Sequence, residues 1–272
     1  MSILLKNGQI INHNSAKKKD IFIENNIVKE IGDNITTKAK NVIDCKGLYI
    51  SPGFVDMHCH LRDPGFLHKE DIETGVKSAI SGGFTSIACM PNTNPPIDTV
   101  DTIKYIIDKA KALNLANVHP IANITKKHSG EELVDVKALK DAGAVAISDD
   151  GKPVANSKLM REAMFAAYEN NIPIIEHCED PSMAYGIVSE GEFSRKNNLL
   201  GVPREAEEID VARQIIIAKT HDLPVHIAHI STKGTVEMIR QAKEKGIKIT
   251  CETCPHYFSL TVEDTLRHKP KC

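Results

Sequence analysis

Two histidines, His58 and His60, stand two residues apart at the end of a short apolar run that begins at Phe54. Such a run predicts a β-strand, and side chains at positions i and i+2 of a strand point to the same face. The two imidazoles are therefore directed at one point, as a metal ion with two nitrogen ligands requires. A strand that ends in two ordinary surface histidines is the alternative, and the ends of the other predicted strands decide between the two.

Polar side chains that can bind a metal or a substrate follow four further apolar runs. They are Asn92 in Met90-Pro91-Asn92-Thr93, the pair Asp149 and Asp150, the run Glu176-His177-Cys178-Glu179-Asp180, and His226 and His229. If these runs are parallel strands, their carboxyl ends meet at one edge of the sheet. Four histidines and a carboxylate gathered at that edge are the donor set of a hydrolytic zinc site.

The elements that must position these residues begin after a different kind of segment. The first 50 residues consist of short β-rich runs, separated by turn signals such as Asn7-Gly8 and Asn25-Asn26. A sheet of this size usually needs a second layer to bury its apolar face. We therefore expect a small N-terminal β module that packs against a partner layer.

From Phe54 onward, strand patterns alternate with amphipathic helical patterns. The predicted strands cover residues 54–58, 86–90, 118–124, 144–148, 172–177, 224–230 and 247–252, and the helical stripes cover residues 72–80, 100–110, 133–139, 159–166, 209–217 and 236–242. This alternation implies parallel strands with right-handed crossovers. Seven strands are one fewer than a (β/α)8 barrel has, and an open sheet is the alternative. Residues 178–205 form an insertion that is long enough to cover a site.

The composition of the 272-residue chain, with 41% hydrophobic and 26% charged residues, is typical of a globular protein. A net charge of −2 provides no basic field for nucleic acid, and no apolar run reaches the ~18 residues of a membrane span. The N-terminal residues lack the basic and apolar regions of a signal peptide. Seven scattered cysteines indicate reduced thiols. Together these features predict a soluble cytoplasmic protein.

In six stretches the chain resembles the dihydroorotases, in particular the bacterial type I branch of the amidohydrolase superfamily. The stretches are Val55–Gly65, Met90–Thr93, Ser148–Gly151, His177–Asp180, Gly201–Glu208 and His226–Thr232. The resemblance implies a (β/α)8-type metal-dependent hydrolase barrel in residues 53–272 and a small β-sandwich part in residues 1–52. The implied activity is the zinc-dependent, reversible cyclisation of N-carbamoyl-L-aspartate to L-dihydroorotate in pyrimidine biosynthesis.

The resemblance also assigns a metal centre with two zinc ions. It implies that one ion is bound by His58 and His60, the other by His177 and His229, and that Asp150 binds or bridges them. Asp149 is the alternative to Asp150, which matches the family ligand that precedes a glycine. Related hydantoinases and allantoinases use a carboxylated lysine there, so the aspartates favour the dihydroorotase branch.

The same resemblance implies how the substrate is held and attacked. A hydroxide shared by the metals is expected to attack the cyclic amide, because the cations lower its pKa and polarise the carbonyl. Arg62 is expected to bind the substrate carboxylate through its bidentate guanidinium, and Asn92 to add a neutral hydrogen bond.

The chain departs from the family pattern at its end. Dihydroorotases continue with an eighth strand, whose aspartate, followed by Ala-Pro-His, is a metal ligand and the general acid/base. No such motif occurs before Cys272. The catalytic acid/base is therefore expected to lie beyond a C-terminal truncation, and the chain alone to be weakly active or inactive.

Several alternatives stay open. Another cyclic amidohydrolase of the hydantoinase or allantoinase type has the same scaffold, and an inactive dihydroorotase-like protein can serve as a scaffold for aspartate carbamoyltransferase. The partners expected are the small-molecule substrate and a second copy of the chain or aspartate carbamoyltransferase, with no nucleic acid and no membrane. Cys251 and Cys254 form a CxxC pair whose side chains diverge on a strand, which predicts plain buried thiols. His226 is expected to be structural.

Overall fold

The computed structural model describes residues 1–268 of the chain, except for the side chain of His268. Residues 269–272, the last of the predicted barrel domain, lie outside the described residues. The chain forms two compact units that divide after Phe54. The domain boundary between residues 52 and 53 stays a prediction.

The first unit is one five-stranded sheet, where the sequence predicts part of a β-sandwich. Its strands are β1 (Ser2–Asn12), β2 (Ser15–Glu24), β3 (Ile27–Gly32), β4 (Asn41–Asp44) and β5 (Tyr49–Ile50). They run in the order β3-β2-β1-β4, and β5 also pairs with β1. Leu4, Phe22 and Ile35 form its small core, and the buried Asp20 accepts hydrogen bonds from the amides of Asn7 (2.8 Å) and Ile35 (3.0 Å).

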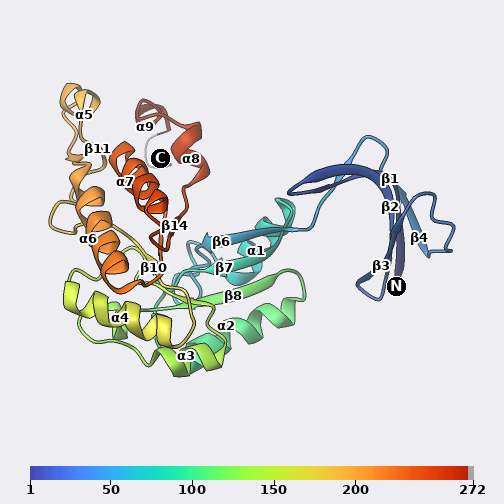
Figure 1. Ribbon diagram of the computed structural model, residues 1–272, viewed down its shortest axis with the longest axis horizontal. Coiled ribbons are helices and arrows are strands. Elements are labelled where there is room, and N and C mark those ends of the chain that lie inside the picture. The colour runs from blue at the N-terminus through green and yellow to red at the C-terminus, as the bar shows by residue number, and fades with distance from the viewer. Residues whose placement is uncertain (269–272) are drawn as a thin grey trace. The chain divides into compact units, whose positions relative to one another are not determined.

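The second unit contains all seven predicted barrel strands, arranged as two neighbouring sheets (Figure 1). The first sheet has the order β6-β7-β8-β9 and the second the order β10-β13-β14. A parallel bridge between Ile147 and Ile174 links them, so the strands follow one another in sequence order. The bounds are β6 (Phe54–Cys59), β7 (Phe84–Cys89), β8 (Asn117–Ala122), β9 (Ala146–Ile147), β10 (Ile175–Glu176), β13 (Val225–Ile227) and β14 (Ile249–Cys251).

Helices follow the strands as the sequence predicts. They are α1 (Ile72–Ser81), α2 (Val100–Leu113), α3 (Val136–Ala142), α4 (Ser157–Glu169), α6 (Glu205–His221) and α7 (Lys233–Glu244), with a 3-10 turn at Lys126–His128. Their apolar stripes pack on the strands, and Ile72, Ile103 and Met160 are fully buried there. The segment after β14 contains α8 (Pro255–Ser259) and α9 (Asp264–His268). None of the helices within residues 1–268 has the length and apolar character to cross a bilayer.

The insertion after β10 has secondary structure of its own. It contains β11 (Val188–Ser189), α5 (Glu192–Lys196) and β12 (Gly201–Val202), and the two strands pair in parallel. The third predicted helix is shorter at its start than its apolar stripe indicates. Leu133 forms a bridge with Thr125, and the helix begins at Val136 after the N-cap Asp135. A carboxylate that accepts from the amide of Ala138 fixes the helix start, so the apolar period alone places it too early.

Two loops that carry predicted substrate ligands pack against each other. The amide of Asn94 donates to the carbonyl of Pro64 at 3.1 Å. At Gly65, where φ is +94°, an added Cβ would overlap the carbonyl of Asn94, so only glycine fits. This contact fixes the loop that carries Arg62 against the loop that carries Asn92.

A buried carboxylate ties the first of these loops to α2. Asp63 follows Arg62 and is 2% exposed. It accepts hydrogen bonds from Lys109 Nζ at 2.6 Å and from Tyr105 Oη at 2.9 Å. The hydrogen bond to Asp63 raises the pKa of Lys109, so the ammonium keeps its charge beside the buried carboxylate.

Candidate metal centre

The structure brings together all five predicted metal ligands at the carboxyl ends of the strands. His58 lies at the end of β6 and His60 just after it, while Asp150 follows β9. His177 directly follows β10, and His229 lies two residues after β13. Because parallel strands end at the same edge, residues far apart in the sequence reach one point in space.

The five side chains form two groups that share Asp150. One group is His58, His60 and Asp150, and the other is Asp150, His177 and His229, with the ligand atoms of each group within 4.8 Å of one another. Asp150 Oδ1 lies 3.7 Å from His58 Nε2 and 3.2 Å from His229 Nε2, while Asp150 Oδ2 lies 3.5 Å from His60 Nε2. His177 Nδ1 lies 3.4 Å from Asp150 Oδ1. Two ligand groups that share one carboxylate are consistent with a site for two metal ions.

The structure distinguishes the two neighbouring aspartates. Asp149 is 1% exposed and accepts hydrogen bonds from Asn123 Nδ2 (3.0 Å), from the amides of Ile124 (2.9 Å) and Thr125 (3.2 Å), and from the Thr125 hydroxyl. These contacts hold its carboxylate in the loop after β8. Asp150 is the aspartate that faces the histidines.

Three of the four histidines have an outer partner on the nitrogen that points away from the cluster. His58 Nδ1 lies 2.5 Å from Glu252 Oε1, and His60 Nδ1 lies 3.0 Å from Asn92 Oδ1. His177 Nε2 lies 3.3 Å from Glu179 Oε2. Each partner fixes the orientation of its imidazole and leaves the other nitrogen directed at the centre.

Glu252 is a site residue that the sequence reasoning missed. It directly follows β14, and its position at a strand end is the signal that identifies the other site residues. Cys251 precedes it, and Cys254 lies two residues after it. Both are free thiols whose pKa burial raises, and no metal-binding group among residues 1–268 contains them. Both thiols are only half-buried, so the prediction of buried thiols is wrong in that respect.

Burial and neighbouring charges act in opposite directions on the site residues. Burial works to raise the pKa of Asp150, but hydrogen bonds from His177 and His229 outweigh it and hold the pKa far below its ordinary value. Burial works to lower the pKa of His177, but Asp150 and Glu179 raise it to about 9. Burial lowers the pKa of His60. Asp150 is therefore anionic, and His177 must lose a proton before it can bind a metal ion through Nδ1.

The predicted substrate ligands lie beside the predicted metal ligands. Arg62 Nη1 donates to Asn92 Oδ1 at 3.4 Å. Asn92 Nδ2 also donates to Asp150 Oδ2 at 3.2 Å, so this amide holds both Asp150 and His60 in addition to the role predicted for it. Arg62 has a φ of 57°, which turns the chain sharply where the strand ends.

A cavity of about 520 Å³ opens directly beside His177 and His229. The insertion predicted to cover a site contributes to its wall with Gly186–Glu190, and Ser231 and Tyr257 line it as well. Its volume is that of a small-molecule site.

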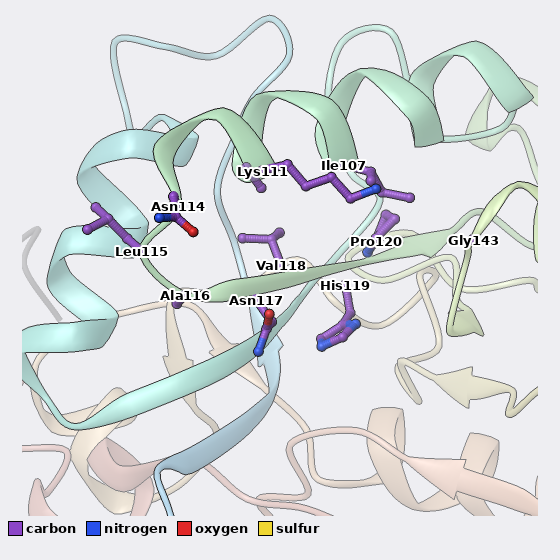
Figure 2. Close-up of a pocket in the computed structure, with 11 residues that line it drawn as sticks. Ile107, Lys111, Asn114, Leu115, Ala116, Asn117, Val118, His119, Pro120 and Gly143 are labelled. Carbon is purple, nitrogen blue, oxygen red and sulfur yellow. The ribbon is translucent and has the colours of Figure 1, made fainter. Parts of the chain in front are cut away.

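A second cavity, of about 330 Å³, lies at the amino end of β8, between this strand and α2 (Figure 2). Lys111 and His119 are the ionisable side chains among its lining residues. None of the metal-binding groups within the described part of the chain includes a residue of this cavity. The predicted metal ligands lie at the opposite, carboxyl end of the strands.

The sequence model of the family described as "Dihydro-orotase-like" matches residues 47–235, which contain all five clustered ligands. The chain belongs to this dihydroorotase-like family. The recognition made from the sequence motifs is thereby confirmed.

Individual dihydroorotases agree with the family match. The chain is 52% identical to the dihydroorotase of Acetivibrio thermocellus over 264 residues, 96% of this chain and 62% of that protein. It is 46% identical to the dihydroorotase of Aquifex aeolicus over 268 residues, 98% of this chain and 64% of that protein. The chain thus spans somewhat less than two thirds of the length of these relatives.

Solved structures confirm the predicted fold class over this length. The L-hydantoinase (dihydropyrimidinase) of Arthrobacter aurescens superposes with a TM-score of 0.84 at 23% identity, covering 98% of this chain and 61% of that one. The dihydropyrimidinase of Brevibacillus agri gives a TM-score of 0.80 at 24% identity, covering 99% and 60%. The described strands and helices of the second unit therefore form a large part of the barrel fold of these structures.

Proposed function

We propose that this protein is a dihydroorotase, which interconverts N-carbamoyl-L-aspartate and L-dihydroorotate. The observation that carries the proposal is the pair of His/Asp groups that share Asp150, on a chain that belongs to the dihydroorotase-like family. Four imidazoles and one carboxylate at the mouth of a barrel are suited to activating water for the cleavage of a cyclic amide.

The donor set favours two zinc ions. His58 and His60 would hold one, His177 and His229 the other, and Asp150 would contact both. When bound, zinc ions lower the pKa of a water molecule and polarise the amide carbonyl. The nitrogen donors and the single shared carboxylate suit zinc better than magnesium or calcium, which prefer oxygen ligands.

The chain's own residues would bind and orient the substrate. Arg62 presents a guanidinium at the edge of the metal cluster, where it would bind the substrate carboxylate in a bidentate pair. Asn92 accepts from Arg62 and contacts His60 and Asp150, so it would set the distance between the bound carboxylate and the metals. The cavity beside His177 and His229 would receive the ring of the substrate.

The function test compares this chain with a chimera that extends it by the C-terminal part of the Acetivibrio thermocellus relative. Each protein is loaded with zinc and offered dihydroorotate, hydantoin and allantoin. We expect the chimera to hydrolyse dihydroorotate in preference to the other two rings.

Other results would support a different function. A preference for hydantoin or allantoin would assign the protein to another type of cyclic amidohydrolase. A zinc-free, inactive chimera that co-purifies with aspartate carbamoyltransferase would support a scaffold instead of an enzyme. A homodimer, a complex with that transferase and a cytoplasmic location stay predictions.

The zinc affinity is expected to rise about tenfold per pH unit between about pH 6.5 and about pH 8. The reason is that His177, whose pKa is raised to about 9, carries a proton that the metal must displace. Zinc buffered by a competing chelator measures the slope, and a flat profile would contradict the raised pKa.

The stability of the metal-free protein is expected to change with pH in the opposite direction, falling as the pH rises. The folded-state pKa of His177 lies above its ordinary value of 6.5. Its contribution to the free energy of unfolding is therefore fully present below about pH 6.5 and is lost as the pH rises through about 9. Urea unfolding without metal provides the control for the binding measurement.

A further inference from the structure

The carboxylate of Glu252 lies between two histidines from different strands. Its Oε1 is 2.5 Å from His58 Nδ1, and its Oε2 is 3.5 Å from His226 Nε2. The other ring nitrogen of His226, Nδ1, lies 2.8 Å from the Thr250 hydroxyl. Glu252 therefore pairs closely with His58 and makes a longer contact with His226, whose buried Nε2 forms no hydrogen bond.

The backbone of Glu252 is fixed by two hydrogen bonds. Its amide donates to the carbonyl of Ile227 at 3.1 Å, and its carbonyl accepts from the amide of Ile230 at 2.9 Å. The first bond connects the end of β14 to β13, and the second connects it to the residue that follows His229. The carboxylate consequently starts from a fixed point, and the reach of its side chain sets the position of the His58 ring.

The two nitrogens of His58 have separate partners. Nδ1 faces Glu252, while Nε2 faces Asp150 at 3.7 Å. A carboxylate acceptor on Nδ1 keeps the proton on that nitrogen, which leaves the lone pair of Nε2 free for a metal ion. The side chains of His58 and Glu252 are only 13% and 17% exposed, so water competes little for this bond.

We propose that Glu252 is a positioning residue for the metal centre, acting through His58 and held in place by His226. The inference rests on the proposed metal centre and extends it to a strand end that supplies no ligand. Because the outer partners of His60 and His177 are Asn92 and Glu179, Glu252 acts on the half of the centre that contains His58. His226, which is predicted to be structural, would support Glu252 through the contact between its Nε2 and Glu252 Oε2.

The test measures zinc affinity for each half of the centre separately. In a His229→Ala background the half with His58 and His60 remains, and in a His60→Ala background the half with His177 and His229 remains. We expect Glu252→Ala to weaken zinc binding about 10–100-fold in the first background, and to leave it unchanged in the second.

Further variants distinguish the position of the acceptor oxygen of Glu252 from its charge and from a general effect on folding. Glu252→Gln keeps an acceptor oxygen at the same reach without the charge, and we expect it to retain most of the affinity. Glu252→Asp keeps the charge but withdraws it by one methylene, and we expect it to lose as much as Glu252→Ala. Glu237→Ala, which removes an exposed glutamate of α7 paired with Arg240, is the matched control and should change neither half.

Each remaining outcome overturns the inference in a recognisable way. Equal affinity of the Glu252→Ala and parent chains in the His229→Ala background would overturn it while leaving the metal centre intact. Equal loss in both backgrounds, or recovery by Asp but not by Gln, would show a general structural or purely electrostatic role. A parent chain that binds no zinc in either background would overturn the proposed centre and this inference together.

Discussion

Replacing Asp150 by Asn is expected to remove both metal ions from the protein. Asp150 is the residue shared by the two ligand groups, and its two oxygens lie 3.2–3.7 Å from imidazole nitrogens of His58, His60 and His229. Two unit charges 4 Å apart attract each other by about 4 kcal/mol at the effective dielectric of a protein site, so losing the carboxylate charge should weaken the binding of each divalent ion by at least about a thousandfold. The amide keeps the shape and one acceptor but loses this charge.

Metal analysis of the purified variant, with chelator competition, measures the effect. Asp141→Asn is the control, because Asp141 is an exposed aspartate paired with Lys137 on α3. Two ions bound to Asp150→Asn with the affinity of the parent would show that the histidines alone form the centre.

Replacing the neighbouring Asp149 by Asn is expected to lower the free energy of unfolding by about 3 kcal/mol or more. Its buried carboxylate accepts from Asn123, from the amides of Ile124 and Thr125, and from the Thr125 hydroxyl. The amide nitrogen of an asparagine would turn a donor toward some of these donors, so hydrogen bonds are lost without a change in volume. Buried donors that lose an acceptor carry the full cost of desolvation.

Urea unfolding of metal-free protein measures this change, because bound ions would add their own stabilisation. The zinc affinity of the folded Asp149→Asn protein should stay close to that of the parent, which separates its role from that of Asp150. Unfolding at the same urea concentration as Asp141→Asn would contradict the structural role.

The barrel strands could be predicted from the sequence because their apolar runs are short, buried and separated by amphipathic helices. The residues at which these strands begin and end could not be predicted in the same way. The fourth strand, predicted over residues 144–148, is observed only at Ala146–Ile147, since pairing with β8 and the bridge from Ile147 to Ile174 determine where the ladder stops. Pairing depends on the partner strand, which a local pattern does not contain.

The site could be predicted as a set of residues but not as a network. His58, His60, His177 and His229 follow from their places at strand ends together with the family resemblance. The choice between Asp149 and Asp150 depends on which carboxylate the loop after β8 captures, and that is decided by Thr125 and its neighbours in space. Asn92 contacts His60, which is 32 positions away in the sequence, and Glu252 contacts His58, which is 194 positions away. No spacing rule connects residues so far apart.

The parallel order of the strands has a consequence for how the chain folds. His58 and His229 belong to elements at distant points of the sequence, yet both must reach Asp150 before either ligand group is complete. Closing such long loops is slow compared with forming a helix or a hairpin. A partly folded chain, in which the strands from β6 to β13 have not all assembled, holds isolated histidines and no centre. Ions that need the complete groups would therefore bind only the fully assembled sheet. They would stabilise the native topology at a late stage of folding.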